Sequence, residues 1–380
     1  MTASRAKAAP APVDLRALGP EALEALVVGL GERPYRARQI FRWLHRRGAA
    51  GLDEMTDVPG PLRQALADRC TLTTLERARE QVSADGTIKW TWRTADGRLV
   101  ESVYMPEQDR RTLCLSTQVG CAVGCTFCLT GTMGLARNLG PGEIVDQVHR
   151  ANRRLVELGL FEGERPLTNL VFMGMGEPLA NYGAVKEALD LLLSPRGPNF
   201  SHRHVTVSTS GLVPAMKLLG KETPVKLAVS LNATTDAVRD AIMPVNRRWP
   251  IAELIRACRE FPARNGRRIT FEYVLLHGVN DSLEDAGRLA DLLRGIPAKV
   301  NLIPYNENPG LGFAAPPAER VVAFQEALAA RNLTVVVRRN RGRDISAACG
   351  QLASEGGPGD PRRPRPMPGA TAEGARPAGA

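Results

Sequence analysis

Apolar runs of strand length alternate with helix-like segments over most of the chain. The strand-like runs span residues 112–116, 169–173, 204–208, 226–231, 269–275, 300–303 and 334–338. Apolar residues at helical spacing occupy the segments 142–159, 184–193, 252–260 and 283–293 between them. Strands that alternate with helices in this way are typical of a parallel sheet covered by helices. The pattern therefore predicts an α/β domain over residues 111–350.

Polar residues near the ends of these strands help to choose between two parallel architectures. Polar or glycine-rich stretches follow strands at 174–178, 208–211, 230–232, 277–281 and 305–306. In a β/α barrel, the carboxyl ends of all strands meet at one rim, where the active site is built. A doubly wound sheet is the alternative, but these stretches favour the barrel. Because the strands are too few for eight units, we expect a partial (β/α)6 barrel.

The first part of the chain, residues 14–75, combines helical periodicity with many arginines. Within it, Ile40, Phe41 and Leu44 are spaced so that one helical face can join a core. The remaining surface of this segment carries Arg36, Arg38, Arg42, Arg46 and Arg47. Such a face is either simply solvated or a contact surface for nucleic acid. We expect a small N-terminal helical domain that binds RNA.

Residues 76–110 read as a β-hairpin connector between these two regions. Alternating runs at 89–94 and 99–105 flank an Asp96-Gly97 turn, which is a strong hairpin signal. The Ala/Pro-rich leader, residues 1–13, and the Gly/Pro/Ala-rich tail, residues 351–380, contain few large apolar residues. We expect both ends to be disordered, because they cannot bury enough apolar surface to fold.

Composition narrows the class of protein further. The formal net charge of +10 favours an acidic partner such as nucleic acid, although a generally basic protein would show the same charge. The seven cysteines, four of which lie within 114–128, do not fit a secreted disulfide framework. No signal-peptide pattern or membrane-length apolar run occurs, so we expect a cytoplasmic protein without a membrane partner. The chain also lacks a P-loop and the dinucleotide-binding glycine pattern.

Three closely spaced cysteines carry the strongest chemical signal. Cys121, Cys125 and Cys128 have C-x3-C-x2-C spacing in a glycine-containing stretch. Three thiolates at this spacing can bind three irons of a [4Fe–4S] cluster and leave the fourth iron open to a small molecule. A structural zinc site is one alternative, but it normally needs a fourth nearby Cys or His. A chance group of three buried thiols is another alternative, but glycines between the cysteines fit a loop better than a packed strand. We therefore expect an iron–sulfur cluster.

The cysteine motif and the Gly-Met-Gly-Glu-Pro stretch at 174–178 together resemble those of radical S-adenosylmethionine (SAM) enzymes. Within that superfamily, the chain is most similar to the RlmN/Cfr family of RNA adenine methyltransferases. The resemblance extends from about residue 35 to residue 352. It rests on the motifs at 112–116, 137–139, 171–178, 207–211, 302–306 and 347–351.

The resemblance implies a role for each matching position. The [4Fe–4S] cluster would be bound by Cys121, Cys125 and Cys128. SAM would be bound by Gly176, Glu177, Ser208, Ser230, Leu231, Asn232 and Asn306. Several relatives carry His at the position of Asn232, and either side chain can form a hydrogen bond. The methyl group would be carried by Cys349, with Cys114 as its resolving partner and Glu101 as proton acceptor.

The implied reaction solves a chemical difficulty. C2 of adenine lies between two ring nitrogens and is too electron-poor to attack the methyl group of SAM. By resemblance, one SAM methylates Cys349, and a second, cleaved at the cluster, gives a radical that takes hydrogen from this methyl group. The methylene radical adds to adenine, Glu101 removes a proton, and Cys114 attacks the sulfur of Cys349 to release the methylated base. An external electron donor such as a flavodoxin or ferredoxin system then restores both cysteines.

The same resemblance implies the substrates. They are an adenosine in the peptidyl-transferase region of 23S rRNA and the adenosine next to the tRNA anticodon, and we expect the enzyme to be a monomer. Cfr-type relatives methylate C8 instead of C2. The N-terminal helices and the stretch 130–139 favour C2, although no physical argument from the sequence separates the two positions. A non-catalytic iron–sulfur protein that binds RNA or senses redox state is an alternative of another class, against which the SAM-pocket residues argue.

Overall fold

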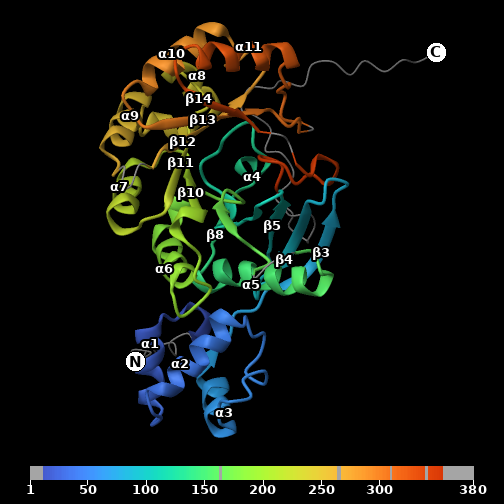
Figure 1. Cartoon of the computed structure of the whole chain (residues 1–380), viewed down its shortest axis with the longest axis vertical. Helices are drawn as coiled ribbons and strands as arrows, with labels where there is room; N and C mark the ends of the chain where they lie inside the picture. Colours follow the sequence, from blue (N-terminus) through green and yellow to red (C-terminus); the bar gives the residue numbers. More distant parts are fainter. Residues whose placement is uncertain (1–11, 162–164, 263–266, 309, 339–340, 354–380) are drawn as a thin grey trace, which may run out of the picture.

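The computed structural model describes residues 12–161, 165–262, 267–308, 310–338 and 341–353. Most of the predicted leader and tail therefore lies outside the described residues. A ten-stranded mixed sheet forms the centre of the protein (Figure 1). Its parallel part consists of β6 (Arg111–Cys114), β9 (Asn169–Phe172), β10 (Val205–Thr209), β11 (Lys226–Ser230), β12 (Ile269–Leu275), β13 (Ala298–Pro304) and β14 (Thr334–Val337). All seven strands were predicted to within a few residues.

Helices connect the consecutive parallel strands and cover the outside of the sheet. They are α5 (Pro141–Leu158), α6 (Tyr182–Leu193), α7 (Val213–Glu222), α8 (Asp236–Ile242), α9 (Ile251–Glu260), α10 (Leu283–Leu293) and α11 (Ala318–Ala329). Six β/α units and a closing strand result, which confirms the predicted partial barrel. The sequence pattern did not identify α7, α8 or α11, although Val321, Phe324 and Leu328 in α11 stand at helical spacing and are buried.

The sheet continues beyond the barrel as an antiparallel extension. The predicted hairpin is present as β4 (Ile88–Arg93) and β5 (Leu99–Pro106), and β5 pairs with β6 of the barrel. A third strand, β3 (Glu76–Val82), pairs with β4 at the edge. Sequence patterning missed β3 because most of its side chains are polar and exposed, so no buried face marks it. The hairpin is therefore part of the main sheet.

The N-terminal segment forms a small helical unit below the barrel in Figure 1. Its elements are β1 (Val13–Asp14), a 3-10 turn (Leu15–Ala17), α1 (Pro20–Gly29), α2 (Tyr35–Phe41), a π-helical turn (Arg42–Arg46), α3 (Gly60–Arg69) and β2 (Cys70–Thr71). As predicted, Ile40, Phe41 and Leu44 are buried. The unit is joined to the barrel by an ion pair between Arg16 and Asp146 of α5, at 3.2 Å and fully buried.

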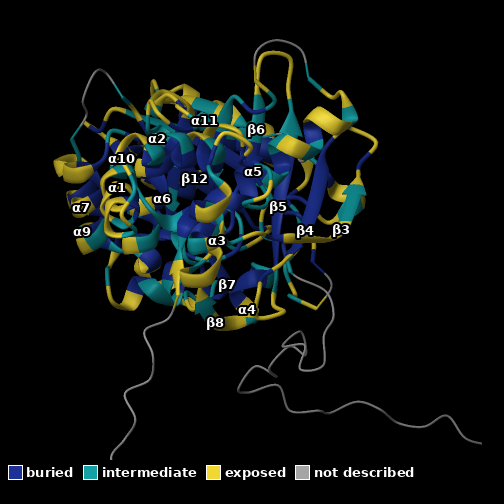
Figure 2. Ribbon diagram, turned by 90° about the horizontal axis from the view of Figure 1, so that it is seen from below, coloured by how far each residue is buried: buried dark blue, intermediate teal, exposed yellow. Residues whose placement is uncertain are grey.

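Burial follows the layers of the fold. Figure 2 shows the buried residues along the strands and on the inner faces of the helices, with exposed residues on the outer turns. One hydrophobic cluster extends from the N-terminal helices through the barrel to the antiparallel strands. None of the helices within the described residues is long and apolar enough to cross a membrane.

Candidate active site

The cysteine motif lies in a loop above the carboxyl end of β6. Cys121 ends β7 (Gln118–Cys121), which pairs with β8 (Gly134–Asn138), and Cys128 directly precedes the short helix α4 (Leu129–Thr132). Gly120 has a φ of +78°, and a Cβ atom there would lie 1.9 Å from the carbonyl oxygen of Gly134. The two strands can pair this closely only because this position is glycine.

The three thiols are free and line one cavity, which is the arrangement expected of cluster ligands. Burial raises the pKa of each thiol, that of Cys121 to about 12, so an electropositive group is needed to hold them as thiolates. Within the described residues, no three Cys, His, Asp or Glu side chains are grouped as ligands of a single metal ion.

The glycine-rich loop after β9 is held against the segment before the cysteines. The backbone N–H of Gly174 donates to the carbonyl oxygen of Leu115 at 2.9 Å, and that of Glu177 donates to Oε1 of Gln118 at 2.8 Å. Gly176 has a φ of +99°, and a Cβ there would lie 2.5 Å from the Cβ of Gln118. The glycines thus let two backbone segments touch where they form one wall of the cavity.

Glu177 is placed by this loop at the floor of the cavity. Its carboxylate accepts hydrogen bonds from the backbone N–H groups of Leu179, at 3.0 Å, and Ser210, at 2.7 Å. Burial raises the pKa of Glu177, while these two hydrogen bonds oppose the shift. A carboxylate held in this way can face a cationic ligand group without rotating away from it.

Most of the predicted SAM-binding residues line the same cavity. They are Gly176, Glu177, Ser208, Ser230, Asn232 and Asn306. Leu231 is fully buried and is not among the lining residues. The amide of Asn232 already has protein partners, because its Oδ1 accepts from Val274 N–H at 2.8 Å and its Nδ2 lies 3.2 Å from Sδ of Met243.

Two buried polar atoms at the cavity have no hydrogen-bond partner among the described residues. They are Oε2 of Glu272 and Oδ1 of Asn306. Buried polar groups in native proteins are nearly always satisfied, and each exception calls for a missing partner. The cavity is therefore suited to a polar ligand, and these acceptor oxygens fit the amino and hydroxyl groups of SAM.

A second cavity adjoins the first and brings the two predicted redox cysteines together. Cys114 and Cys349 both line it, and Cys349 and Cys128 line both cavities. Cys349 is exposed, whereas burial raises the pKa of Cys114 to about 12. Nη1 of Arg338 lies 3.7 Å from Sγ of Cys349. The structure thus places the expected methyl-carrying cysteine between the cluster ligands and its expected partner.

Glu101, the predicted proton acceptor, is almost completely buried beside this second cavity. It stands in β5 on the same face as Val103 and Met105, which line the cavity. Oε2 of Glu101 accepts a hydrogen bond from Ala353 N–H at 3.0 Å. Glu101 itself is not among the lining residues of either cavity.

Sequence reasoning missed two residues that shape the site, Arg239 and Glu272. Arg239 is fully buried and donates to the carbonyl oxygens of Ser210, at 2.7 Å, and Leu231, at 2.9 Å, which ties together the ends of β10 and β11. Glu272 and Arg338 line the first cavity. Glu272 could have been found from the sequence, because it is an acidic residue within the otherwise apolar run 269–275. Nothing in the sequence pattern marks Arg239.

Comparison with known proteins agrees with this geometry. Residues 115–290 match the model of the radical SAM superfamily, and residues 13–72 match the N-terminal domain of ribosomal RNA large-subunit methyltransferases. A crystal structure of a radical SAM methyltransferase from Sphaerobacter thermophilus is similar with a TM-score of 0.85 and 51% identity, covering 90% of this chain and 99% of that one. The fold and the site therefore define a radical SAM enzyme.

Curated relatives identify the family within this class. A protein from an Anaeromyxobacter species, named dual-specificity RNA methyltransferase RlmN, is 78% identical over 93% of this chain and 94% of its own length. A protein of the same name from Geobacter sulfurreducens is 51% identical over 90% of this chain and 92% of its own length. The chain belongs to the RlmN family of radical SAM RNA methyltransferases, whose cofactors are a [4Fe–4S] cluster and SAM.

Proposed function

We propose that this protein methylates C2 of an adenosine in the peptidyl-transferase region of 23S rRNA and of the adenosine next to the tRNA anticodon. The observation that carries the proposal is the convergence of Cys121, Cys125, Cys128, Cys114 and Cys349 on two adjoining cavities. The first three thiols suit the ligands of a cluster. Cys349 and Cys114 suit a methyl carrier and its resolving partner. The dual specificity in the names of the relatives supports both RNA substrates.

The cluster ligands in this proposal are Cys121, Cys125 and Cys128. When bound, the cluster supplies the electron that cleaves SAM to a carbon radical, which C2 of adenine requires. Glu177 holds the cationic end of SAM, and Oδ1 of Asn306, which has no partner among the described residues, accepts a hydrogen bond from SAM. Ser208, Ser230 and Asn232 complete the walls around it.

Cys349 carries the methyl group because it is exposed and faces both cavities. Nη1 of Arg338 lies 3.7 Å from its sulfur, and Arg338 lines both cavities with it. Cys114, which is buried in the second cavity, attacks the sulfur of Cys349 at the end of the reaction. A disulfide forms, the bond between this sulfur and the methylene carbon breaks, and the methylated base leaves. Glu101 accepts the proton lost from the substituted ring carbon.

RNA would be held outside the rim by the basic N-terminal helices. Arg38, Arg42, Arg46 and Arg47 are exposed there, and Arg38, Arg42 and Arg46 line one groove with Arg196 from the barrel. Arginine side chains bind phosphates without regard to sequence, which suits a protein that acts on two different RNAs. The target base must leave its stack to enter the rim.

The remaining assignments concern the setting of the reaction. We expect a monomer in the cytoplasm, reduced by a flavodoxin or ferredoxin system that regenerates the two thiols. Methylation at C8 is the alternative within the chemistry, and the relatives named RlmN favour C2. A redox sensor without catalysis would have no use for the unpartnered polar atoms of the first cavity.

The test is anaerobic turnover of the reconstituted protein with SAM, a reductant and a fragment of 23S rRNA or tRNA. Digestion to nucleosides and mass spectrometry should give 2-methyladenosine, which disappears in Cys349→Ala and persists in Cys70→Ala. Cys70 is a suitable control because it lines neither of the two cavities. 8-Methyladenosine would overturn the regiochemistry, and the absence of SAM cleavage would overturn the enzymatic function.

A further inference from the structure

Lys89 is a buried charged residue without a role in the proposed reaction. It stands in β4 opposite Val103 of β5, and Thr91 of β4 stands opposite Glu101. Because side chains directly opposite on paired strands face the same side, Lys89 and Glu101 lie on one face of the sheet. Val103 lines the cavity of Cys114 and Cys349 from that face. Lys89 therefore stands on the face of the sheet that borders this cavity.

Lys89 has two polar partners in this nearly dry environment. Its Nζ lies 3.6 Å from Oε1 of Glu101, and the two side chains are 6% and 3% exposed. The same Nζ donates to the carbonyl oxygen of Ser346 at 3.1 Å. Burying an ammonium group costs free energy unless the group is paired, so a lysine at this position calls for an explanation beyond packing.

Both partners of Lys89 lead to the segment that carries Cys349. Ser346 begins this segment, and Ala353 at its end donates its N–H to Oε2 of Glu101 at 3.0 Å. The side facing the cluster loop is held as well, because the N–H of Leu129 donates to Gly350 at 2.9 Å and Oγ1 of Thr130 to Leu352 at 2.6 Å. The segment 346–353 therefore spans from the cluster loop to the Lys89–Glu101 pair.

We propose that Lys89 is a positioning residue that keeps Glu101 ionised as the proton acceptor and fixes the Cys349 segment relative to it. The inference rests on the role proposed above for Glu101. In the step concerned, the C–H bond at the substituted ring carbon breaks, its proton moves to Glu101, and the electron pair stays in the ring. Only an ionised carboxylate can accept that proton, and a positive charge close by favours the ionised form of a buried carboxylate.

A single-turnover experiment with Lys89→Met tests this role. Methylation of Cys349 and formation of the covalent protein–RNA adduct should be retained, whereas release of methylated RNA should slow by about 10- to 100-fold, since a general base contributes on that order or more. Lys89→Arg keeps the charge and should restore release to within about threefold of the original rate. Arg93→Met is the matched control, because Arg93 lies in the same strand but is exposed and 3.9 Å from Glu76.

The outcomes separate this inference from the proposed function. Suppose that Lys89→Met releases methylated RNA at the original rate, whereas Glu101→Gln releases none. That result would overturn the role of Lys89 and leave the proposed function intact. If Lys89→Met folds poorly, the double variant Lys89→Met/Glu101→Gln removes both charges of the pair. Its release rate should equal that of Glu101→Gln, because Lys89 acts through Glu101, and an additional slowing would contradict this.

Hydrogen exchange supplies a readout that does not depend on turnover. In the reconstituted protein without RNA, residues 346–353 should exchange faster in Lys89→Met than in the unaltered protein or in Arg93→Met. The reason is that the contact of Lys89 with Ser346 restrains the start of this segment. Unchanged exchange would overturn the positioning of the segment by Lys89.

Discussion

The parallel and antiparallel halves of the central sheet hold their functional residues in different ways. In the parallel half, the cysteine loop, Glu177 and Asn306 all follow the carboxyl ends of strands. In the antiparallel half, Lys89 and Glu101 stand within β4 and β5 and point from the face of the sheet. The topology of the parallel strands is therefore enough to locate the cysteine loop, Glu177 and Asn306. Lys89 and Glu101 are located only by the segment that packs on their face of the sheet. The parallel half would bind the cofactors, and the antiparallel half would accept the proton from the substituted ring carbon.

Removing a cluster ligand should lower methylation more than any other change, through loss of the cofactor site in the parallel half. We expect Cys125→Ala to lose cluster binding and to lower methylation by more than about 10³-fold, because the cofactor carries the radical chemistry. Iron content, visible absorbance and 5′-deoxyadenosine formation measure the loss. Cys70→Ala should keep all three. A Cys125→Ala protein that still cleaves SAM would show that the ligand set is wrong.

Gly176→Ala should have the next largest effect, through the glycine-rich loop. The added Cβ would meet Gln118 at 2.5 Å and require a φ of +99°, so the loop must shift and move Glu177. We expect SAM affinity to fall by about 10- to 100-fold, or about 1.4–2.7 kcal/mol, in a binding titration. Gly183→Ala in α6 has open space around it and should leave SAM affinity unchanged. Equal affinities for both variants would contradict the role of the loop.

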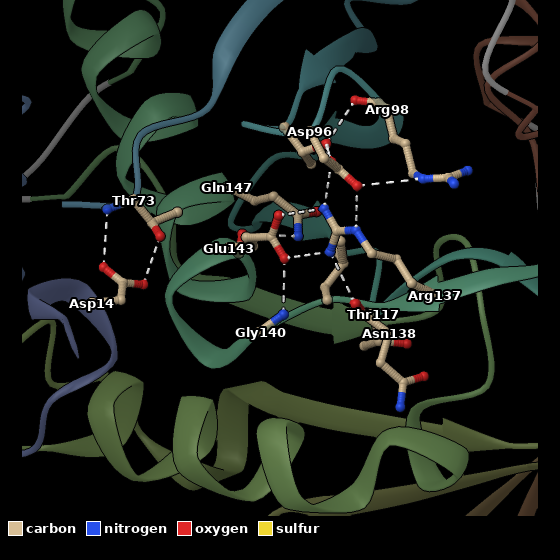
Figure 3. Close-up of polar contacts among 12 residues, drawn as sticks. Asp14, Thr73, Asp96, Arg98, Thr117, Arg137, Asn138, Gly140, Glu143 and Gln147 are labelled. Carbon is tan, nitrogen blue, oxygen red and sulfur yellow. Dashed lines mark hydrogen bonds and ion pairs between the residues drawn. The ribbon is translucent and has the colours of Figure 1, made fainter. Parts of the chain in front are cut away.

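Arg137 connects the two halves, so its loss should lower stability without removing a catalytic group. Figure 3 shows its guanidinium between Asp96 of the hairpin turn and Glu143 of α5, and both carboxylates are reached at 2.8 Å. We expect Arg137→Met to lower the free energy of unfolding by about 1–3 kcal/mol, since charge-assisted hydrogen bonds are lost. Arg98→Met, which removes a more exposed partner of Asp96 at 3.3 Å, should have a smaller effect.

The contact with Arg137 also predicts a dependence of stability on pH. The hydrogen bond from Arg137 is the largest cause that lowers the pKa of Asp96 in the folded protein. Since the pKa is depressed on folding, the stabilisation is complete above the unfolded value, about 4, and is lost as the pH falls below it. Urea unfolding between pH 3 and 6 should show this decline in the unaltered protein and a weaker one in Arg137→Met. Parallel curves would contradict the assignment.

The sequence predicted the parallel half well because its signals are local. Apolar strands, the cysteine spacing and the polar strand ends each follow from a few neighbouring residues, and the structure has them where expected. The antiparallel half was less predictable. β3 has no buried face, and Lys89 resembles any polar residue in an alternating strand until Ser346, more than 250 positions later, is brought next to it. Arg239 was missed for the same reason, since its partners are backbone carbonyl oxygens that no pattern reveals.

The smallest effect is expected outside the sheet, in the N-terminal helices that both halves would rely on for RNA. Arg38→Gln and Arg46→Gln remove exposed charges that line the same groove. Each should weaken RNA binding by about three- to tenfold and reduce the slope of log K against log salt by about 1, while SAM cleavage without RNA stays unchanged. Arg294→Gln, directly after α10 and with a side chain 79% exposed, is the control and should leave the slope as it is. If the groove variants bind like this control, RNA contacts lie elsewhere, and the rim itself must supply the affinity.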